Sequence, residues 1–236
     1  MLRFARIALS NQSSHMHSSC TLCSSGVVIP AEKDEIMRQL ECFEHESEAF
    51  DGLIFDGFEP FAHPELVTVL NQARSLGARR IGLHTDGGAL SSLQNAHGCV
   101  ETGVRIFEIS WLGATESSHD ALTKKPGLFN AMHHGIAALH QIQRERGIHL
   151  ALIAKLEVCE HNKRELLAMA QDAMQQEVTA LRIHDPSGVL SQDEIAQLYD
   201  SAITQGVAVF GEGVSELASA QLYTLVSLDE EASCNS

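Results

Sequence analysis

The sequence predicts an α/β fold, specifically a partial (β/α)6 TIM-like barrel of parallel strands in a single domain. One observation is that strand-length apolar runs alternate with helix-length amphipathic segments, which is typical of βαβ units. Another is that six or seven such units follow one another within 236 residues, with no Pro/Gly-rich linker or low-complexity stretch between them. A doubly wound open sheet is the alternative architecture.

Seven segments are predicted to be strands because they are short runs rich in β-branched and aliphatic residues. Runs of this kind are typical of parallel strands that are buried on both faces. The segments are residues 4–9, 52–56, 79–84, 104–110, 149–155, 178–184 and 207–210. Together they predict one parallel sheet.

Six segments between the strands are predicted to be helices because their apolar residues recur every three or four positions. They are residues 31–48, 64–75, 91–100, 127–146, 162–175 and 191–204, of which 91–100 has the weakest pattern. The first begins after Pro30, and the last begins with a capping box formed by Ser191 and Glu194. We expect residues 1–225 to form the barrel and residues 226–236 to be an acidic, flexible tail.

The charge of the chain limits the partners that it can bind. The chain has 16 Lys and Arg against 31 Asp and Glu, a formal net charge of -15, which repels phosphate backbones and anionic lipids. It has no run of about 18 apolar residues that could span a bilayer, its N-terminal apolar stretch is short for a signal peptide, and its six cysteines are scattered. We expect a cytoplasmic protein with no nucleic-acid or membrane partner.

The loop after the first predicted strand is the most ligand-rich part of the sequence. His15, His17, Cys20 and Cys23 lie within nine residues. Thiolates three residues apart can reach one soft metal centre, and imidazoles can supply further ligands. We predict a metal or cluster site here. The alternatives are a loop with two reduced, idle cysteines and a redox dithiol, although a redox dithiol is expected at a helix N-terminus.

The loops after the strands, taken in order, resemble the motifs of the radical S-adenosylmethionine (radical SAM) superfamily over residues 2–210. Cys20 and Cys23 resemble the last two thiolates of the family's C-x-x-x-C-x-x-C loop, which holds a [4Fe–4S] cluster. The other matching stretches are Gly57-Phe58-Glu59-Pro60 with His63-Pro64-Glu65-Leu66 (family G-G-E-P and H-P-x-L), Thr85-Asp86-Gly87 (T-N-G), Ile109-Ser110-Trp111-Leu112-Gly113 with His119-Asp120 (I-S-L-D-G and H-D), and Lys125-Pro126-Gly127-Leu128-Phe129. Each stretch alone is weak, but five in order at family-like spacing are specific.

The resemblance implies a partial barrel that binds a [4Fe–4S] cluster and S-adenosylmethionine (SAM). Cys20 and Cys23 would be cluster ligands, and the resemblance assigns no catalytic residue. The residues that it carries over to cofactor binding are Gly57, Phe58, Glu59, Pro60, Thr85 and Ser110. Because the chemistry of parallel α/β folds sits at the carboxyl ends of the strands, positions 20, 57, 85 and 110 are predicted to converge at one rim.

Three positions depart from the family pattern, each in a different part of the cofactor site. Met16 stands where the first cluster thiolate of the family belongs. A thioether is a weak, neutral iron ligand, so the flanking His15 and His17 are candidate metal ligands together with Met16. Phe58 replaces the second Gly of G-G-E-P, whose backbone lies against the SAM amino group in the family. Leu112 replaces the ribose-contacting Asp and cannot accept a hydrogen bond. Together these departures indicate loss of the usual radical chemistry.

Three hypotheses follow. The first is a non-catalytic binding or partner protein of a maturation or modification pathway, which binds a peptide substrate or a partner maturation enzyme. The second is an active radical SAM enzyme acting on a peptide or small molecule, whose third cluster ligand is His15, His17 or a displaced cysteine such as Cys42. The third is a structural zinc site formed by His15, His17, Cys20 and Cys23.

Four polar residues near the ends of later strands complete the candidates. Lys155, Arg182 and His184 end the fifth and sixth predicted strands and are expected to face the barrel mouth. Asn162 stands where members of the resembling family often have an Asn after the fifth strand, and it is equally suited to cap the following helix.

Overall fold

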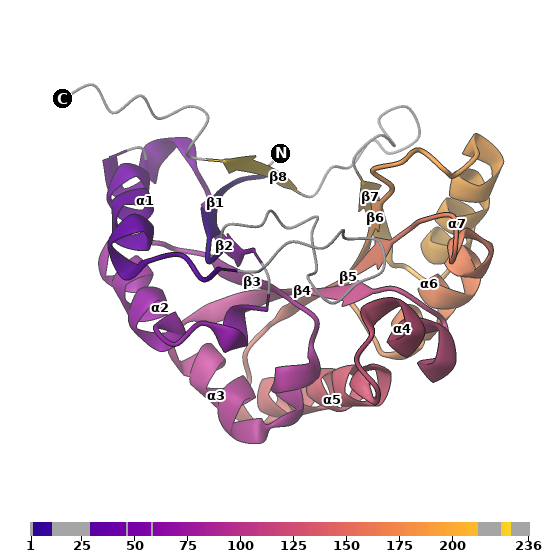
Figure 1. Ribbon diagram of the computed structural model, residues 1–236, viewed down its shortest axis with the longest axis horizontal. Helices are drawn as coiled ribbons and strands as arrows, with labels where there is room; N and C mark the ends of the chain where they lie inside the picture. The colour runs from indigo at the N-terminus through magenta and orange to yellow at the C-terminus, as the bar shows by residue number, and fades with distance from the viewer. Residues whose placement is uncertain (1, 11–28, 46, 58, 212–222, 228–236) are drawn as a thin grey trace.

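The chain folds into a parallel β-sheet that is curled into a half-barrel (Figure 1). The computed structural model describes residues 2–10, 29–45, 47–57, 59–211 and 223–227. The strands are β1 (Leu2–Ala8), β2 (Gly52–Asp56), β3 (Ile81–Thr85), β4 (Val104–Trp111), β5 (Ala151–Glu157), β6 (Ala180–His184), β7 (Ala208–Gly211) and β8 (Tyr223–Ser227). Their order is β7-β6-β5-β4-β3-β2-β1-β8, and every neighbouring pair is parallel. The predicted partial TIM-like barrel is therefore confirmed.

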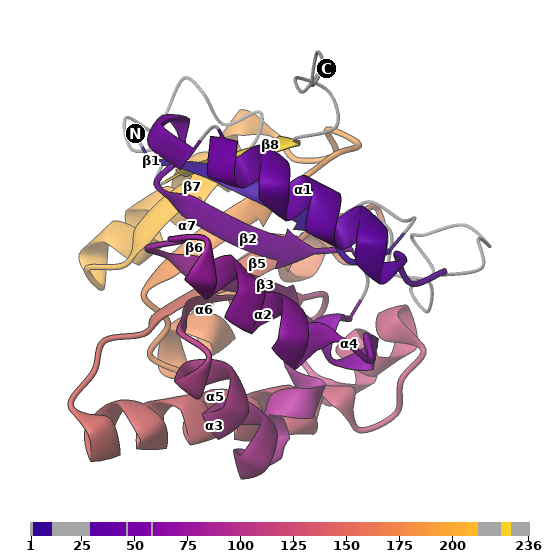
Figure 2. The same ribbon diagram turned by 90° about the vertical axis from the view of Figure 1, so that its left-hand side faces the viewer.

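The helices of the described chain all lie on the convex side of the sheet. They are α1 (Lys33–His45), α2 (Leu66–Ser75), α3 (Leu93–Glu101), α4 (Glu116–Thr123), α5 (Leu128–Arg146), α6 (Leu166–Gln175) and α7 (Gln192–Thr204). Figures 1 and 2 show α1, α2 and α3 following one another around the outside of β1, β2 and β3. A doubly wound sheet carries helices on both faces, so that alternative is wrong.

The structure departs from the predicted elements in three places. The sequence predicts that the fifth strand ends at residue 155, yet β5 continues to Glu157, because Leu156 and Glu157 still pair with β6. The unpredicted helix α4 begins at a capping box in which Thr115 and Ser118 exchange hydrogen bonds. The unpredicted β8 pairs with β1 and runs to Ser227, past residue 225.

Two apolar layers hold the half-barrel together. The larger one fills the space between the sheet and the helices. The smaller one lies on the concave face toward the amino ends of the strands and consists of Phe4, Ile54, Ile106, Ile153, Ala180 and Phe210. Gly82 belongs to this level, where a Cβ would lie 2.7 Å from Ile54 Cδ1 and 3.1 Å from Ile106 Cβ. A glycine therefore lets the side chains of β2 and β4 approach each other across β3.

None of the helices in the described ranges combines the length and the apolar character that crossing a lipid bilayer requires.

Candidate functional site

The predicted site residues that the structure describes meet at one rim of the half-barrel. Gly57 directly follows β2, Thr85 ends β3, and Ser110 is the residue before the end of β4 at Trp111. Parallel strands bring these carboxyl ends to the same edge, as predicted. His15, Met16, His17, Cys20, Cys23 and Phe58 lie outside the described residues, so the cluster and zinc predictions stay predictions. Within the described ranges, no group of three or more His, Cys, Asp or Glu side chains is arranged to hold a metal ion.

Cys42, the candidate for a displaced cluster ligand, lies at the other end of the molecule. It belongs to the last turn of α1, and Phe43 beside it lines a pocket with Gly52, the first residue of β2. The amino ends of the strands, not the carboxyl ends, form that part of the half-barrel. Cys42 is therefore not placed to supply a third cluster ligand at the mouth, and the candidates His15 and His17 lie outside the described residues.

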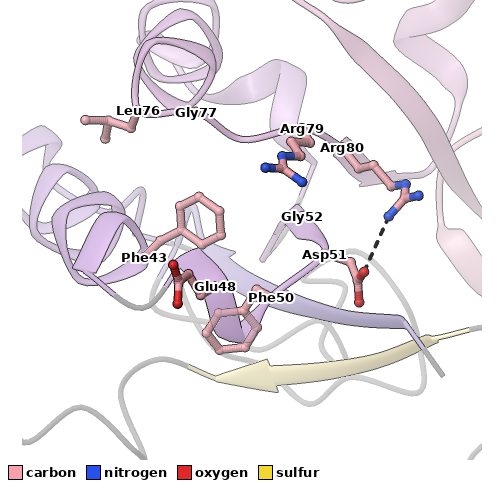
Figure 3. Close-up of a pocket in the computed structure, with 9 residues that line it drawn as sticks. All are labelled: Phe43, Glu48, Phe50, Asp51, Gly52, Leu76, Gly77, Arg79 and Arg80. Atoms are coloured by element: carbon pink, nitrogen blue, oxygen red, sulfur yellow. Dashed lines mark hydrogen bonds and ion pairs between the residues drawn. The ribbon is translucent and has the colours of Figure 1, made fainter.

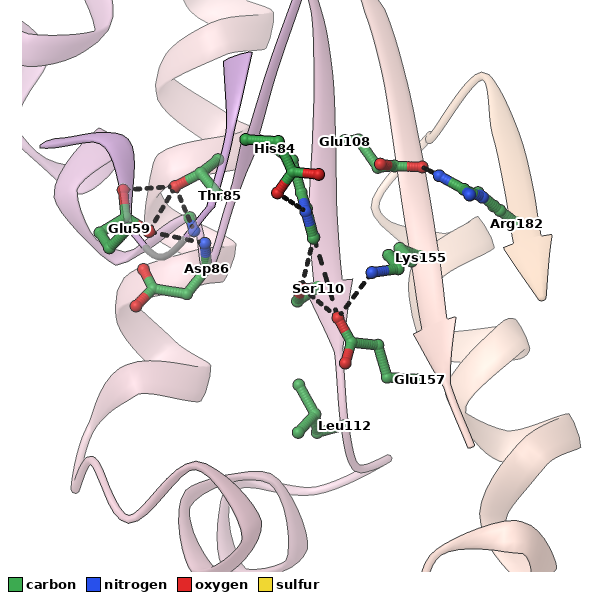
Figure 4. A network of polar contacts seen from close by, with 12 residues as sticks. Glu59, His84, Thr85, Asp86, Glu108, Ser110, Leu112, Lys155, Glu157 and Arg182 are labelled. Carbon is green, nitrogen blue, oxygen red and sulfur yellow. Dashed lines mark hydrogen bonds and ion pairs between the residues drawn. The ribbon is translucent and has the colours of Figure 1, made fainter. Parts of the chain in front are cut away.

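Glu59 connects the loops that follow β2 and β3. Its carboxylate accepts hydrogen bonds from Thr85 Oγ1 at 2.8 Å, from the Asp86 backbone N–H at 2.8 Å and from the Phe61 backbone N–H at 3.3 Å. The last bond caps the short 3-10 helix η2 (Pro60–Ala62). The acidic residue of the G-G-E-P-like stretch is thus fixed from two sides (Figure 4).

The acid–base state of this junction is set by burial and by one lysine. Burial, and then the negative charge of Asp86, raises the pKa of Glu59 to about 8. Burial also acts to raise the pKa of Asp86, but the Lys125 ammonium 2.7 Å away outweighs it and holds that pKa below its ordinary value. At pH 7 the structure therefore favours a protonated Glu59 beside an ionised Asp86.

Leu112, which the sequence resemblance aligns with a ribose-contacting Asp, is enclosed by the protein. Its side chain is 1 % exposed. Its backbone N–H donates to Nδ1 of His119 at 3.3 Å, and its carbonyl accepts from Asn162 Nδ2 at 2.8 Å. A Cβ on the next residue, Gly113, would collide with the backbone N of His119. Neither the side chain nor the backbone of Leu112 is left to bind a diol.

The His-Asp pair after β4 has a structural role in this chain. Burial lowers the pKa of His119 to about 4, so its ring is neutral at pH 7. Its Nε2 is buried and has no hydrogen-bond partner among the described residues. Asp120 accepts hydrogen bonds from the backbone N–H groups of Gly127 and Phe129, at the start of α5. The pair therefore fixes the loop after β4 and the entry to α5.

Asn162 ties two loops of the rim together. Its side-chain amide donates to the carbonyls of Leu112 and Glu157, at 2.8 and 2.7 Å, and its Oδ1 accepts from the Cys159 N–H at 2.8 Å. Its side chain makes no capping bond to the following 3-10 helix η4 (Lys163–Glu165). Asn162 thus stands at the N-cap position, as the second of the two expectations has it, but its acceptor Oδ1 binds the Cys159 N–H and caps no N–H of the helix.

An ionic layer lies on the concave face directly above the apolar layer. Its residues come from successive strands β1 to β6 and are Arg6, Asp56, His84, Glu108, Lys155 and Arg182, with Ser110 and Glu157 one level higher. Figure 4 shows most of them pointing into the half-barrel. Lys155 and Arg182, which the sequence predicts to face the barrel mouth, lie inside the half-barrel in this layer, and both are buried, as is His184.

The contacts of the ionic layer run across the sheet from strand to strand. Arg6 Nε lies 3.0 Å and His84 Nδ1 lies 3.1 Å from the Asp56 carboxylate. The other short contacts are His84 Nε2–Ser110 Oγ at 2.9 Å, Ser110 Oγ–Glu157 at 2.7 Å, Lys155–Glu157 at 3.3 Å and Arg182–Glu108 at 2.7 Å. Three acids thus balance three permanent bases.

The pKa shifts in the layer agree with paired charges. Burial raises the pKa of Asp56, but the opposing interaction with His84 and then Arg6 leaves it far below its ordinary value. Burial also acts to raise the pKa of Glu108, but Arg182, His84 and Lys155 together lower it below its ordinary value. Burial and the Lys155 charge lower the pKa of His84. The Asp56 and Glu108 carboxylates are therefore ionised and paired at neutral pH.

A small pocket opens at the mouth beside the G-G-E-P-like stretch. It has a volume of about 190 Å³ and is lined by residues that include Leu9, Pro30, Gly57, Glu59 and His63. Cofactor pockets usually measure about 300–1,000 Å³. The pocket formed by the described residues is thus smaller than a site for a nucleoside cofactor.

No family model matches the sequence, and no curated protein matches it either. Solved structures do match the fold. SuiB from Streptococcus suis, solved with S-adenosylmethionine, has a TM-score of 0.63 at 8% identity, covering 90% of this chain and 48% of SuiB. The radical S-adenosylmethionine methyltransferase TsrM from Kitasatospora setae has a TM-score of 0.52 at 13% identity, covering 77% and 35%. Methylornithine synthase (PylB) has a TM-score of 0.58 at 9% identity, covering 93% and 74%.

These similarities define the class of fold. The half-barrel is a radical SAM-like barrel, and the chain spans about half the length of SuiB. At identities this low the likeness shows the fold alone. The residues described above must therefore carry any statement about the chemistry of this chain.

Proposed function

We propose that this chain is a radical SAM-like protein with a degenerate cofactor site, which acts as a non-catalytic binding or partner protein in a maturation or modification pathway. The observation that carries the proposal is Leu112. A side chain that cannot accept a hydrogen bond stands at the position that the resemblance assigns to ribose contact, and the backbone N–H and carbonyl of that residue are bonded to His119 and Asn162. The residues at this position do not fit a ribose diol.

Three further features support the proposal. The pocket beside Gly57 and Glu59, at about 190 Å³, is small for a nucleoside cofactor. Ser110 is held between His84 and Glu157, and Thr85 donates to Glu59, so both motif hydroxyls serve internal contacts. The replacements Met16 and Phe58 in the sequence act in the same direction.

The partner that we propose is a peptide substrate or the enzyme that modifies it. SuiB, a match in fold, has also been solved with its precursor peptide SuiA, with a TM-score of 0.64 at 9% identity. Radical SAM-like barrels can therefore be combined with peptide recognition. A partner chain could supply chemistry that Leu112, Phe58 and Met16 no longer support here.

Titration calorimetry with SAM on anaerobically reconstituted protein tests the proposal. A carboxylate–diol contact contributes on the order of 1.5–3 kcal/mol, and its loss weakens binding roughly ten- to hundredfold. We expect no binding by the wild-type chain up to about 1 mM SAM, where the binding free energy is about -4 kcal/mol. A micromolar dissociation constant, or cleavage of SAM by the wild-type protein, contradicts the proposal.

Restoring the family residues gives the matched gain-of-function experiment. The triple variant Met16→Cys/Phe58→Gly/Leu112→Asp is expected to bind SAM at least about tenfold more tightly than the wild type. The control is the same triple variant with Leu112→Asn in place of Leu112→Asp. Asn has nearly the size of Asp but no charge, so this variant should bind SAM more weakly than the Leu112→Asp variant. Because a buried Asp can impair folding, Met16→Cys/Phe58→Gly with the native Leu112 is measured in parallel. No gain in any variant contradicts our assignment of these positions.

Metal analysis separates the other two hypotheses. Iron and sulfide that depend on Cys20, together with SAM cleavage, support the enzyme with His15 or His17 as the third ligand. One zinc per chain in protein purified without added metal, lost on Cys23→Ala, supports the structural zinc site. If the protein is the non-catalytic partner that we propose, we expect neither a cluster that depends on Cys20 nor one zinc per chain.

A further inference from the structure

A second pocket opens at the opposite end of the half-barrel, where the strands begin. We call it the basal pocket. It has a volume of about 430 Å³, and its lining residues belong to the amino ends of β1, β3, β4, β5 and β6 or to the segments just before them. This volume falls within the range of small-molecule sites. The pocket is separated from the mouth by the apolar layer and the ionic layer.

The basal pocket combines an apolar floor with a basic rim. The floor includes Phe4, Ile106 and Ile153, which belong to the concave apolar layer. The rim carries three arginines, Arg79, Arg80 and Arg105, together with His149, and none of the described residues that line the pocket is Asp or Glu. This local excess of positive charge is unusual in a chain whose formal net charge is -15.

The arginines of the rim differ in how they are paired. Arg80 lies 3.5 Å from the Asp51 carboxylate. Figure 3 shows this contact in a neighbouring pocket, which Arg79 and Arg80 line as well as the basal pocket. Arg105 donates to the backbone carbonyls of Val100 and Val104, both at 2.8 Å. These acceptors are neutral, so the two bonds do not offset the charge of the guanidinium. Arg79 is exposed and has no hydrogen bond or ion pair with any described residue.

The charges around Arg105 repel one another. Burial, followed by the positive charges of Arg74 and Arg146, lowers the pKa of the Arg105 guanidinium. A bound anion would relieve this repulsion and would gain charge-assisted hydrogen bonds from guanidinium groups. An apolar group on the same molecule would cover the floor, where hydrocarbon burial is favourable.

We propose that the basal pocket binds a small organic anion, in which one carboxylate or phosphate group is carried on an apolar acyl or aryl body. The anionic group lies against Arg79 and Arg105, and the apolar body covers Phe4, Ile106 and Ile153. This site is independent of the proposed function, because it lies at the other end of the strands and uses none of the residues near the mouth.

Three probes of graded chemistry test the pocket by titration calorimetry: octanoate, 1-octanol and acetate. Octanoate has both the anionic group and the apolar body, whereas octanol lacks the charge and acetate lacks the chain. We expect octanoate to bind at least about tenfold more tightly than either of the others, since a charge-assisted hydrogen bond is worth on the order of a tenfold change in affinity. Octyl phosphate and inorganic phosphate repeat the comparison for the phosphate group.

Variants locate the binding site. Arg79→Gln removes an exposed charge that has no partner among the described residues, so the risk to folding is small. It should weaken octanoate binding about tenfold while octanol binding is unchanged. Arg164→Gln, an exposed arginine after β5 at the mouth end, is the matched control and should leave binding unchanged. Ala151→Leu, which fills the pocket from β5, should abolish binding of octanoate.

Two outcomes overturn the proposal. Octanol binding as tightly as octanoate shows a site that is only apolar, and equal octanoate affinity in wild type, Arg79→Gln and Ala151→Leu shows binding elsewhere. Arg105→Gln is a second charge variant, checked by circular dichroism because it also removes hydrogen bonds to the carbonyls of Val100 and Val104. Titration of SAM against the same variants reports the mouth separately, so failure of one proposal is distinguishable from failure of the other.

Discussion

Glu108 and Arg182 show how strongly single residues of the ionic layer depend on their partners. Their side chains lie 2.7 Å apart with almost no exposed surface. Removing one charge of a buried pair leaves the other in an environment of low polarity, which costs about 3–5 kcal/mol. The layer contains several such contacts, so most of its residues are expected to be intolerant of single substitutions.

Arg182→Met should therefore lower the free energy of unfolding by about 3–5 kcal/mol, measured by urea denaturation. Lys163→Gln is the control, because it breaks the exposed contact between Lys163 and Glu160, and it should change stability by less than about 1 kcal/mol. A loss below about 1 kcal/mol for Arg182→Met would show that Glu108 is well solvated or compensated without the guanidinium.

Glu59 makes the stability of the protein depend on pH. Its pKa is raised from 4.5 to about 8 in the folded state. Between these values the unfolded chain releases the Glu59 proton and the folded chain keeps it, so this group makes the free energy of unfolding fall as pH rises from about 4.5 to 8. Asp86, whose pKa is lowered, contributes with the opposite sign and at lower pH.

Glu59→Gln should flatten this part of the pH profile, since the amide keeps an acceptor for Thr85 and Asp86 and cannot ionise. Urea denaturation at several pH values from 5 to 8 measures the slope. Glu44→Gln, which changes an exposed carboxylate on α1, should leave the slope as in the wild type. An unchanged slope in Glu59→Gln would assign the pH dependence to another group.

At the scale of elements, the Asn162 side chain joins the loops after β4 and β5. Asn162→Ala removes three hydrogen bonds and leaves two buried carbonyls and a buried N–H without that partner. We expect a loss of about 2–4 kcal/mol, because unsatisfied buried polar groups are costly. Asn130→Ala, at an exposed position of α5, should change stability by less than about 0.5 kcal/mol. Equal effects of the two variants would contradict the role of Asn162.

Most elements could be predicted from the sequence because their patterns are local. The capping box of Ser191 and Glu194 correctly marks the start of α7, and β2 has the predicted bounds. Helix α4 was missed because it is short and begins at a Thr115–Ser118 box rather than the Ser/Thr-x-x-Glu/Gln pattern. The partner strand of β8 is β1, at the other end of the chain, and such long-range pairing leaves no local signal.

The ionic layer could have been predicted only by following the alternation within each strand. In β2 and β4 to β6 an apolar inward residue is followed two positions later by a charged one: Ile54 and Asp56, Ile106 and Glu108, Ile153 and Lys155, Ala180 and Arg182. Residues two apart in a strand share a face. The pairing of acids with bases across strands depends on register, however, and register is a property of the folded sheet.

At the scale of the whole molecule, the concave apolar layer joins strands from both ends of the half-barrel. Phe4 comes from β1 and Phe210 from β7. Since all eight described strands belong to one sheet, we expect circular dichroism in the near and far ultraviolet to report a single, coincident unfolding transition.

Phe4→Ala should shift both signals together and lower the free energy of unfolding by about 3–5 kcal/mol, because Phe4 is buried and a large cavity results. Val67→Ala removes an exposed side chain of α2 and should change stability by less than about 0.5 kcal/mol. Separate transitions of the two signals would show that parts of the half-barrel unfold independently.

Along each inner strand, residues that face the interior alternate with residues that face the helices, and this alternation also affects how the strands align while the chain folds. If β4 slipped by one residue against β5, Glu108 would turn toward the apolar helices and Ile109 would turn into the interior. Misaligned chains would thus bury unpaired charge, at several kcal/mol per ion. We expect Glu108→Leu/Arg182→Met to keep more stability than Arg182→Met alone, but to refold with a lower yield of monomer in size-exclusion chromatography. A wild-type yield would show that the apolar residues alone select the correct alignment.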